Sequence, residues 1–170
     1  KGFSIENQIP LITPTATASY LTKGASLYFF RAAMSDRRRT NTLSKWLQNK
    51  NPTSQSTIIY ETKTKQQIND NWPKLFGESL GYDLASDLAK SNMAYSLINY
   101  YRGTSKNSIF DIITSLTTKK LNNPIVILGL TKDTSAIGLA IRKHHPKSEL
   151  YFIGPVEHIL ESHDELEGVF

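Results

Sequence analysis

The sequence predicts an α/β fold of three layers, in which helices cover both faces of a parallel sheet. Short apolar runs of strand length alternate along the chain with longer runs of helical periodicity. The apolar run at 124–128 is uninterrupted, as is typical of a strand buried on both faces of a parallel sheet. Alternation of strands with helices also implies right-handed crossovers between parallel neighbours.

The first elements are two short strands on either side of a hydroxyl-rich turn. Residues 9–13 form an apolar run whose early proline restricts it to an edge strand or a strand beginning. In the turn that follows, Thr17 or Ser19 can cap a short helix. The aromatic-rich run at 27–31 is the second strand.

From Asp36 the period becomes helical, and the predicted helix ends near residue 49. The β-branched run at 57–61 is a strand. Residues 65–77 have a helical pattern that Pro73 kinks or splits, and 84–90 add a further helical turn or two.

The last part of the chain continues the alternation. The expected elements are a strand at 96–101, a helix at 109–116, the buried strand at 124–128, a helix that begins near Asp133, and a strand at 150–153.

Composition limits the classes of function. The chain has 170 residues, which is one domain's worth, and it has no cysteine and no apolar stretch long enough to span a membrane. Its net charge of +5 is not concentrated, and the run Arg37–Arg39 is read as a solvated helix flank, so nucleic acid is not an expected partner.

Patterns that carry chemistry are missing. No GxxxxGK[ST], GxGxxG or GxSxG occurs, so the sequence contains neither a phosphate loop nor a hydrolase elbow. His144 and His145 end a predicted helix, where cations are favourable, and His158 and His163 lack the HExxH spacing. We therefore expect no catalysis, no metal and no cofactor, and an enzyme acting on phosphates is the disfavoured alternative.

In open α/β sheets, ligands bind beyond the carboxyl ends of the strands. The hydroxyl-rich turn at 13–19 could hold an anionic head group, although an ordinary cap explains it equally simply. Polar residues also follow the strands at 57–61, 124–128 and 150–153, and each of these tips could be an ordinary polar loop.

Several segments resemble the leucine/isoleucine/valine-binding family of type I periplasmic binding proteins. Residues 9–22 (IPLITPTATASYLT) are similar to the family's IPxISPxATxPxLT, and 28–36 are similar to its YxFRTxxSD. Weaker likenesses follow at 57–61, 124–129 and 150–154.

The resemblance implies two lobes that close on a ligand. Residues 1–30 would then be the end of the first lobe and the hinge crossing, and 31–156 the second lobe, which is Rossmann-like or flavodoxin-like. Residues 157–170 would be a tail or a return toward the first lobe. The implied ligand-binding residues are Thr15, Ala16, Thr17, Lys65, Thr131 and Glu157.

Two departures weaken an amino-acid specificity. Lys65-Gln66 stands where the family has Tyr-Gly, and Val156 stands where it has a glutamate, with Glu157 one place later. The implied function is recognition of a small polar molecule, such as an amino acid, outside the cytoplasm or in the periplasm, with a membrane transporter or a sensor as partner. The alternative is a degenerate binding fold that acts as a protein-interaction or homodimerisation module.

Overall fold

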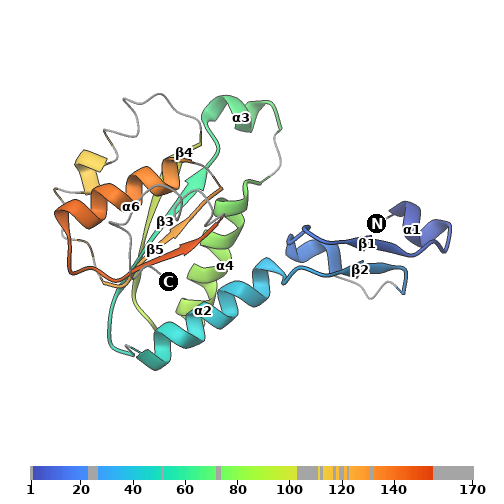
Figure 1. Ribbon diagram of the computed structural model, residues 1–170, viewed down its shortest axis with the longest axis horizontal. Coiled ribbons are helices and arrows are strands. Elements are labelled where there is room, and N and C mark those ends of the chain that lie inside the picture. The colour runs from blue at the N-terminus through green and yellow to red at the C-terminus, as the bar shows by residue number, and fades with distance from the viewer. Residues whose placement is uncertain are drawn as a thin grey trace.

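The computed structural model describes residues 2–22, 27–50, 52–71, 74–102, 111, 113–116, 118, 121, 123–130 and 132–154. These residues form an α/β domain and an arm that projects from the amino end of helix α2 (Figure 1). The arm consists of α1 (Gly2–Glu6), β1 (Leu11–Thr13), the 3₁₀ turn η1 (Ser19–Thr22) and β2 (Phe29–Arg31). The α/β domain begins with α2 (Asp36–Lys50).

The domain is built on one parallel sheet with the strand order β4-β3-β5-β6. Its strands are β3 (Ser56–Thr62), β4 (Tyr95–Tyr101), β5 (Ile125–Leu128) and β6 (Leu150–Ile153). The two central strands, β3 and β5, are buried along nearly their whole length, whereas β4 at one edge is only partly buried. The predicted parallel pairing is confirmed.

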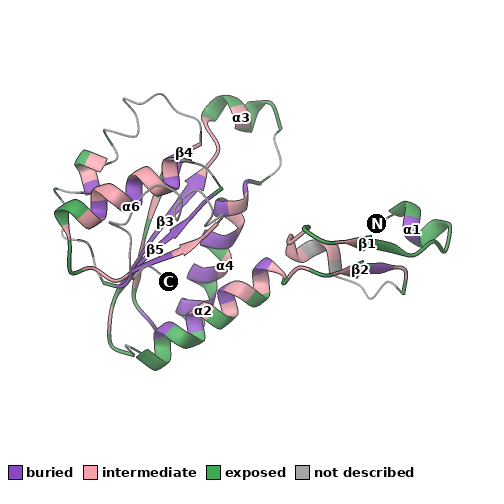
Figure 2. Ribbon diagram, in the orientation of Figure 1, coloured by how far each residue is buried: buried purple, intermediate pink, exposed green. Residues whose placement is uncertain are grey.

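Helices cover both faces of this sheet and complete the three predicted layers. On one face, α2 and α4 (Phe76–Lys90) pack against Ile58, Tyr60 and Val126. On the other face, α6 (Lys132–His144) packs against Ile59 and Ile127. Neighbouring residues of a strand point to opposite faces of the sheet, so they enter two separate cores. Figure 2 shows the buried strands at the centre of the domain.

The helices after β3 differ from the sequence prediction. α3 is a short helix (Lys65–Asn69) that begins with a capping box, because the Thr64 hydroxyl accepts from the Gln67 N–H and the Gln67 side chain accepts from the Thr64 N–H. α4 then begins at Phe76 and continues to Lys90, so the predicted helix over 65–77 and the separate turns at 84–90 are wrong in their boundaries. Ile68, which is part of the helical pattern predicted over 65–77, is 56% exposed, so the pattern does not mark a buried helix face at this residue.

Two ion pairs join α2 to α4. Arg37 binds the buried Asp87 at 2.7 Å and Asp83 at 3.7 Å, and the Thr40 hydroxyl donates to Asp87 at 3.4 Å. Arg37 is therefore part of a helix–helix contact, and only its neighbours fit the predicted solvated flank.

The arm has little to pack against among the described residues. β1 and β2 pair in parallel, and the Ser4 hydroxyl contacts the carbonyl oxygens of Ile9 and Tyr28. Ile12 and Leu27 are nevertheless 68% and 82% exposed. A two-stranded sheet is marginal in water, so this pair requires further structure to be stable.

Candidate functional site

The order of the strands marks one place on the sheet as the candidate ligand site. The chain passes from β3 to β4 on one side, and then crosses β3 to reach β5 and β6 on the other. The connections therefore diverge between β3 and β5, and such a switch point opens a crevice beyond the carboxyl ends of the strands. We call this end of the sheet the rim, defined by the residues that end or follow the strands, namely Glu61–Lys65, Arg102, Gly129, Leu130 and Gly154.

The side chain of Glu61 is buried at the switch point. This side chain is 0% exposed, and its oxygens accept from the N–H of Gly77 at 3.1 Å and from the N–H of Leu130 at 3.4 Å. Arg102 donates to it twice, from Nε at 3.2 Å and from Nη2 at 3.3 Å. A buried carboxylate is tolerated only when it is paired and hydrogen-bonded, and here its partners come from α4 and from the loops after β4 and β5.

A glycine makes this arrangement possible. A Cβ atom at Gly77 would collide with the Cγ of Glu61 and with the carbonyl oxygen of Leu128. The first turn of α4 therefore lies directly against the ends of β3 and β5, and its N–H group reaches the buried carboxylate. The helical pattern predicted over 65–77 has Gly77 as its last residue, whereas in the structure Gly77 lies in the first turn of α4, where it allows close packing.

The hydroxyl-rich turn lies at the junction between the arm and α2. The carbonyl oxygen of Thr17 accepts from the N–H of Asp36 at 2.9 Å and from Nη1 of Arg31 at 3.1 Å. The N–H of Ala16 donates to the Thr13 hydroxyl at 3.2 Å. Thr15 is exposed, and Ala16 and Thr17 are half-buried.

Asp36 is a buried acid at this junction. Burial raises its pKa above the ordinary value of 3.8, while a hydrogen bond with Thr17 and the charge of Arg39 act in the opposite direction. Among the described residues its Oδ1 atom has no hydrogen-bond partner. The junction therefore holds a carboxylate whose charged form is disfavoured by the surrounding protein.

The predicted site residues are only partly placed. Thr15, Ala16 and Thr17 share one loop, and Lys65 is an exposed residue at the start of α3 on the rim. Thr131 and Glu157 lie outside the described residues, as does the tail from residue 155. Among the described residues, the loop forms hydrogen bonds with β2 and α2, so its approach to Lys65 stays a prediction.

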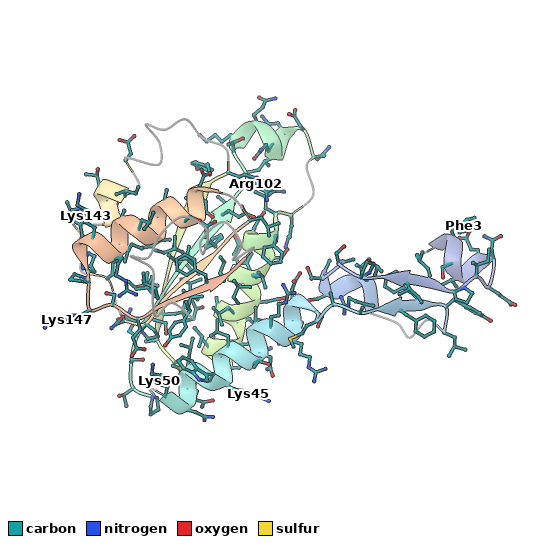
Figure 3. All side chains as sticks on the ribbon, viewed as in Figure 1. Phe3, Lys45, Lys50, Arg102, Lys143 and Lys147 are labelled. Carbon is teal, nitrogen blue, oxygen red and sulfur yellow. The ribbon has the colours of Figure 1, made fainter. Side chains whose placement is uncertain are left out.

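Sequence reasoning missed the pairing of Glu61 with Arg102. The two residues are 41 positions apart, and each appears in the sequence only as a polar residue near the end of a strand. The available signal was their common place at the carboxyl ends of adjacent strands. Figure 3 shows Arg102 at the end of the sheet nearest α3, with Lys147 at the opposite end of the domain.

A second concave surface lies beside the edge strand β6. It is a groove of about 640 Å³, lined mainly by apolar side chains of α2 and β6, with Arg39 and Lys50 among its lining residues. Lys50 binds Glu149 at 3.1 Å and donates to the Tyr151 hydroxyl at 3.2 Å. A mainly apolar lining with a few charged side chains suits a ligand or protein segment that carries an apolar part.

Membrane-spanning helices and metal-binding clusters are both absent from the described part of the chain. No helix there is long and apolar enough to cross a membrane. No group of three or more histidine, aspartate or glutamate side chains there is arranged to hold a metal ion.

Comparison with solved structures identifies the fold. No protein-family model matches the chain, and no curated protein matches its sequence. A leucine-binding protein of Thermotoga maritima is similar over 99% of this chain and 45% of its own length, with 14% identity and a TM-score of 0.66. A substrate-binding periplasmic protein of Ralstonia solanacearum covers 89% of this chain and 38% of its own, with 14% identity and a TM-score of 0.63.

A third solved structure agrees with these two. A protein from Rhodospirillum rubrum, described as a branched-chain amino acid ABC transporter, is similar over 98% of this chain and 44% of its own, with 16% identity and a TM-score of 0.67. The chain thus spans less than half the length of these structures. The predicted type I periplasmic-binding-protein fold, present as part of that fold, is confirmed.

Proposed function

From the fold that this chain shares with solved periplasmic binding proteins, we propose that it is part of a two-lobed binding protein for a small polar solute, such as an amino acid. In this proposal residues 1–30 end the first lobe and cross the hinge, 31–156 form the second lobe, and 157–170 are a tail or return toward the first lobe. The observation that carries the proposal is the polar rim at the switch point of a parallel sheet. Binding would favour the closed arrangement of the lobes, and no catalysis is involved.

The exposed arm supports the two-lobed reading. β1 and β2 form a parallel pair whose residues Ile12 and Phe30 are 68% and 50% exposed. Further strands beside this pair would bury those side chains and make the arm part of a larger sheet. The similar structures, which are more than twice as long as this chain, have room for such a sheet.

We place the ligand between the arm's loop and the rim. Thr15, Ala16 and Thr17 would supply one wall, with the exposed Thr15 hydroxyl available to a polar head group. Lys65, Thr131 and Glu157 would supply the other wall.

A second pair of residues, besides Lys65-Gln66, could correspond to the Tyr-Gly of the leucine/isoleucine/valine-binding family. Phe76-Gly77 begins α4, the long helix that follows β3, whereas Lys65-Gln66 belongs to the short α3 before it. We propose that Phe76 is the aromatic residue nearest the ligand on this wall.

The partner and compartment follow from the same reasoning. The similar structures are described as a leucine-binding protein, a periplasmic substrate-binding protein and a branched-chain amino acid ABC transporter. We propose a periplasmic or extracytoplasmic location and a membrane transporter or sensor as partner.

A titration of the chain with a panel of amino acids tests the proposal. Because one lobe alone surrounds only part of a ligand, we expect binding no tighter than the millimolar range, detected by NMR as saturable shifts at residues 15–17 and at the rim. Replacing Thr15→Val should weaken these shifts, and the control Thr53→Val, in the exposed turn before β3, should not. Micromolar affinity by calorimetry would show that the chain is complete as a binder, and shifts confined to the groove beside β6 would refute the site.

An interaction module is the alternative function, and one observation favours it. The apolar side chains of the arm would also be buried by a protein partner. The comparisons give no support for a homodimer. Light scattering on the purified chain distinguishes a monomer from a dimer.

A further inference from the structure

Arg102 is held in a fixed orientation by the buried carboxylate beside it. Nε and Nη2 both donate to Glu61, at 3.2 and 3.3 Å, and the main-chain N–H of Arg102 donates to the carbonyl oxygen of Thr62 at 3.2 Å. Glu61 is itself fixed by the N–H groups of Gly77 and Leu130. The guanidinium group is therefore preorganised without a ligand.

Among the described residues, this orientation leaves one edge of the guanidinium group without an acceptor. A planar guanidinium has five N–H donors, and the pairing through Nε and Nη2 occupies one side of the fork. The opposite edge comprises Nη1 and the second hydrogen of Nη2, and among the described residues Nη1 has no acceptor. The Arg102 side chain is 29% exposed, so part of it is accessible to a solute.

The charge of the rim suits an anion. Glu61 neutralises one of the positive charges there, and the exposed Lys65 adds a further one at the start of α3. An excess of positive charge beside a partly exposed arginine fork is the arrangement that binds carboxylate and phosphate groups in a bidentate manner.

We infer that Arg102, oriented by Glu61, is the anion-recognising residue of the rim and binds a carboxylate or phosphate oxyanion of the ligand through its free edge. Glu61 is a positioning residue, because it acts on the ligand only through Arg102. The inference rests on the proposed function, since it assumes that the rim faces the solute.

An NMR titration with simple anions tests this inference. The probes are sodium acetate and sodium phosphate at constant ionic strength, with sodium chloride as the reference for general charge screening. We expect the Arg102 side-chain Nε resonance and the amide signals of Thr62 and Arg102 to shift in a saturable manner with acetate, phosphate or both. The relative affinity of the two probes identifies the oxyanion that the fork prefers.

Variants assign the effect to the fork. Arg102→Gln alone would leave a buried carboxylate unpaired and could unfold the chain, so the test uses the double variant Glu61→Gln/Arg102→Gln, which removes both charges together. We expect its affinity for the anion to fall about tenfold or more, as the loss of a charge-assisted bidentate contact implies. Lys147→Gln, at the opposite end of the domain, removes one exposed charge and should leave the affinity unchanged.

A retained affinity in the double variant, or shifts no larger than those with chloride, would overturn the inference. Glu61→Gln alone should weaken binding less than the double variant, because the arginine is present but no longer held. The failure of this test differs from failure of the proposed function. If amino acids shift the rim while acetate and phosphate do not, the solute site stands and the role of Arg102 is refuted.

Discussion

Gly77 offers the sharpest test of the packing at the rim. A methyl group at this position would collide with the carbonyl oxygen of Leu128 and with the buried side chain of Glu61. The carbonyl oxygen belongs to the buried strand β5, so the backbone would have to shift to make room. Gly138 gives a matched control in α6, since a methyl group there would meet the ring of Phe152, the outer end of a partly buried side chain. Both replacements by alanine are expected to improve helix propensity.

The magnitude follows from two opposing effects. Overpacking of a closely packed site costs about 1–3 kcal/mol, and loss of one hydrogen bond to the buried carboxylate adds about 1 kcal/mol. The gain in helix propensity recovers at most about 1 kcal/mol. Gly77→Ala should therefore lower the free energy of unfolding by about 1–3 kcal/mol, whereas Gly138→Ala should leave it within about 1 kcal/mol of wild type.

Urea unfolding followed by circular dichroism measures both changes. The midpoint should fall for Gly77→Ala while the slope of free energy against denaturant stays constant. In thermal unfolding, each 1 kcal/mol corresponds to about 2–4 °C for a chain of this size. A Gly77→Ala midpoint equal to or above wild type would refute the close approach of α4 to the strand ends.

Three further predictions concern other parts of the chain. Burial raises the pKa of Asp36 above 3.8, so the folded state favours the protonated carboxyl group. The free energy of unfolding of wild type relative to Asp36→Asn should therefore decline as the pH rises through and above 3.8. Urea midpoints of both proteins, measured from about pH 3.5 to about pH 7, give this difference. Ile127→Ala should cost about 2–5 kcal/mol in urea unfolding, since Ile127 is 0% exposed in β5, and a loss under 1 kcal/mol, roughly the cost of a surface change, would contradict its placement. Ile12→Ser should reduce concentration-dependent self-association in light scattering, because Ile12 is 68% exposed on the arm; unchanged association would exclude this face of the arm as its cause.

The strands were predictable from sequence because their signal is local. β3, β4, β5 and β6 each lie within one residue of the predicted positions, since apolar and β-branched runs bounded by polar turns reflect burial directly. The parallel arrangement followed from the helices between them.

The helix boundaries after β3 were not predictable in the same way. Gly77 looks like a helix terminator, and only the approach of α4 to Glu61 and Leu128 explains why a glycine starts that helix. The turn between α3 and α4 also includes Asn71 in a left-handed conformation, with φ of 53°, which no apolar period reveals. Tertiary packing decided both features.

The candidate site shows the same limit. The sequence identified the loop at 15–17 and the strand tips as polar, but the pairing of Glu61 with Arg102 joins residues 41 positions apart. Such a contact depends on which strands become neighbours and in which register, and here Glu61 lies opposite Tyr100 in β4. Polar residues that meet across strands have no sequence period of their own.

The bonds between Thr17 and the start of α2 have a mechanical consequence. The main-chain N–H of Asp36 donates to the Thr17 carbonyl oxygen and the main-chain N–H of Arg37 donates to the Ser19 hydroxyl, each at 2.9 Å, so the loop is attached to the helix at two points. Rotation of the arm away from the domain at this junction would break both hydrogen bonds, at a free-energy cost of about 1–3 kcal/mol in total. These two bonds therefore resist rotation of the arm relative to α2, and any such rotation has to stretch or exchange them.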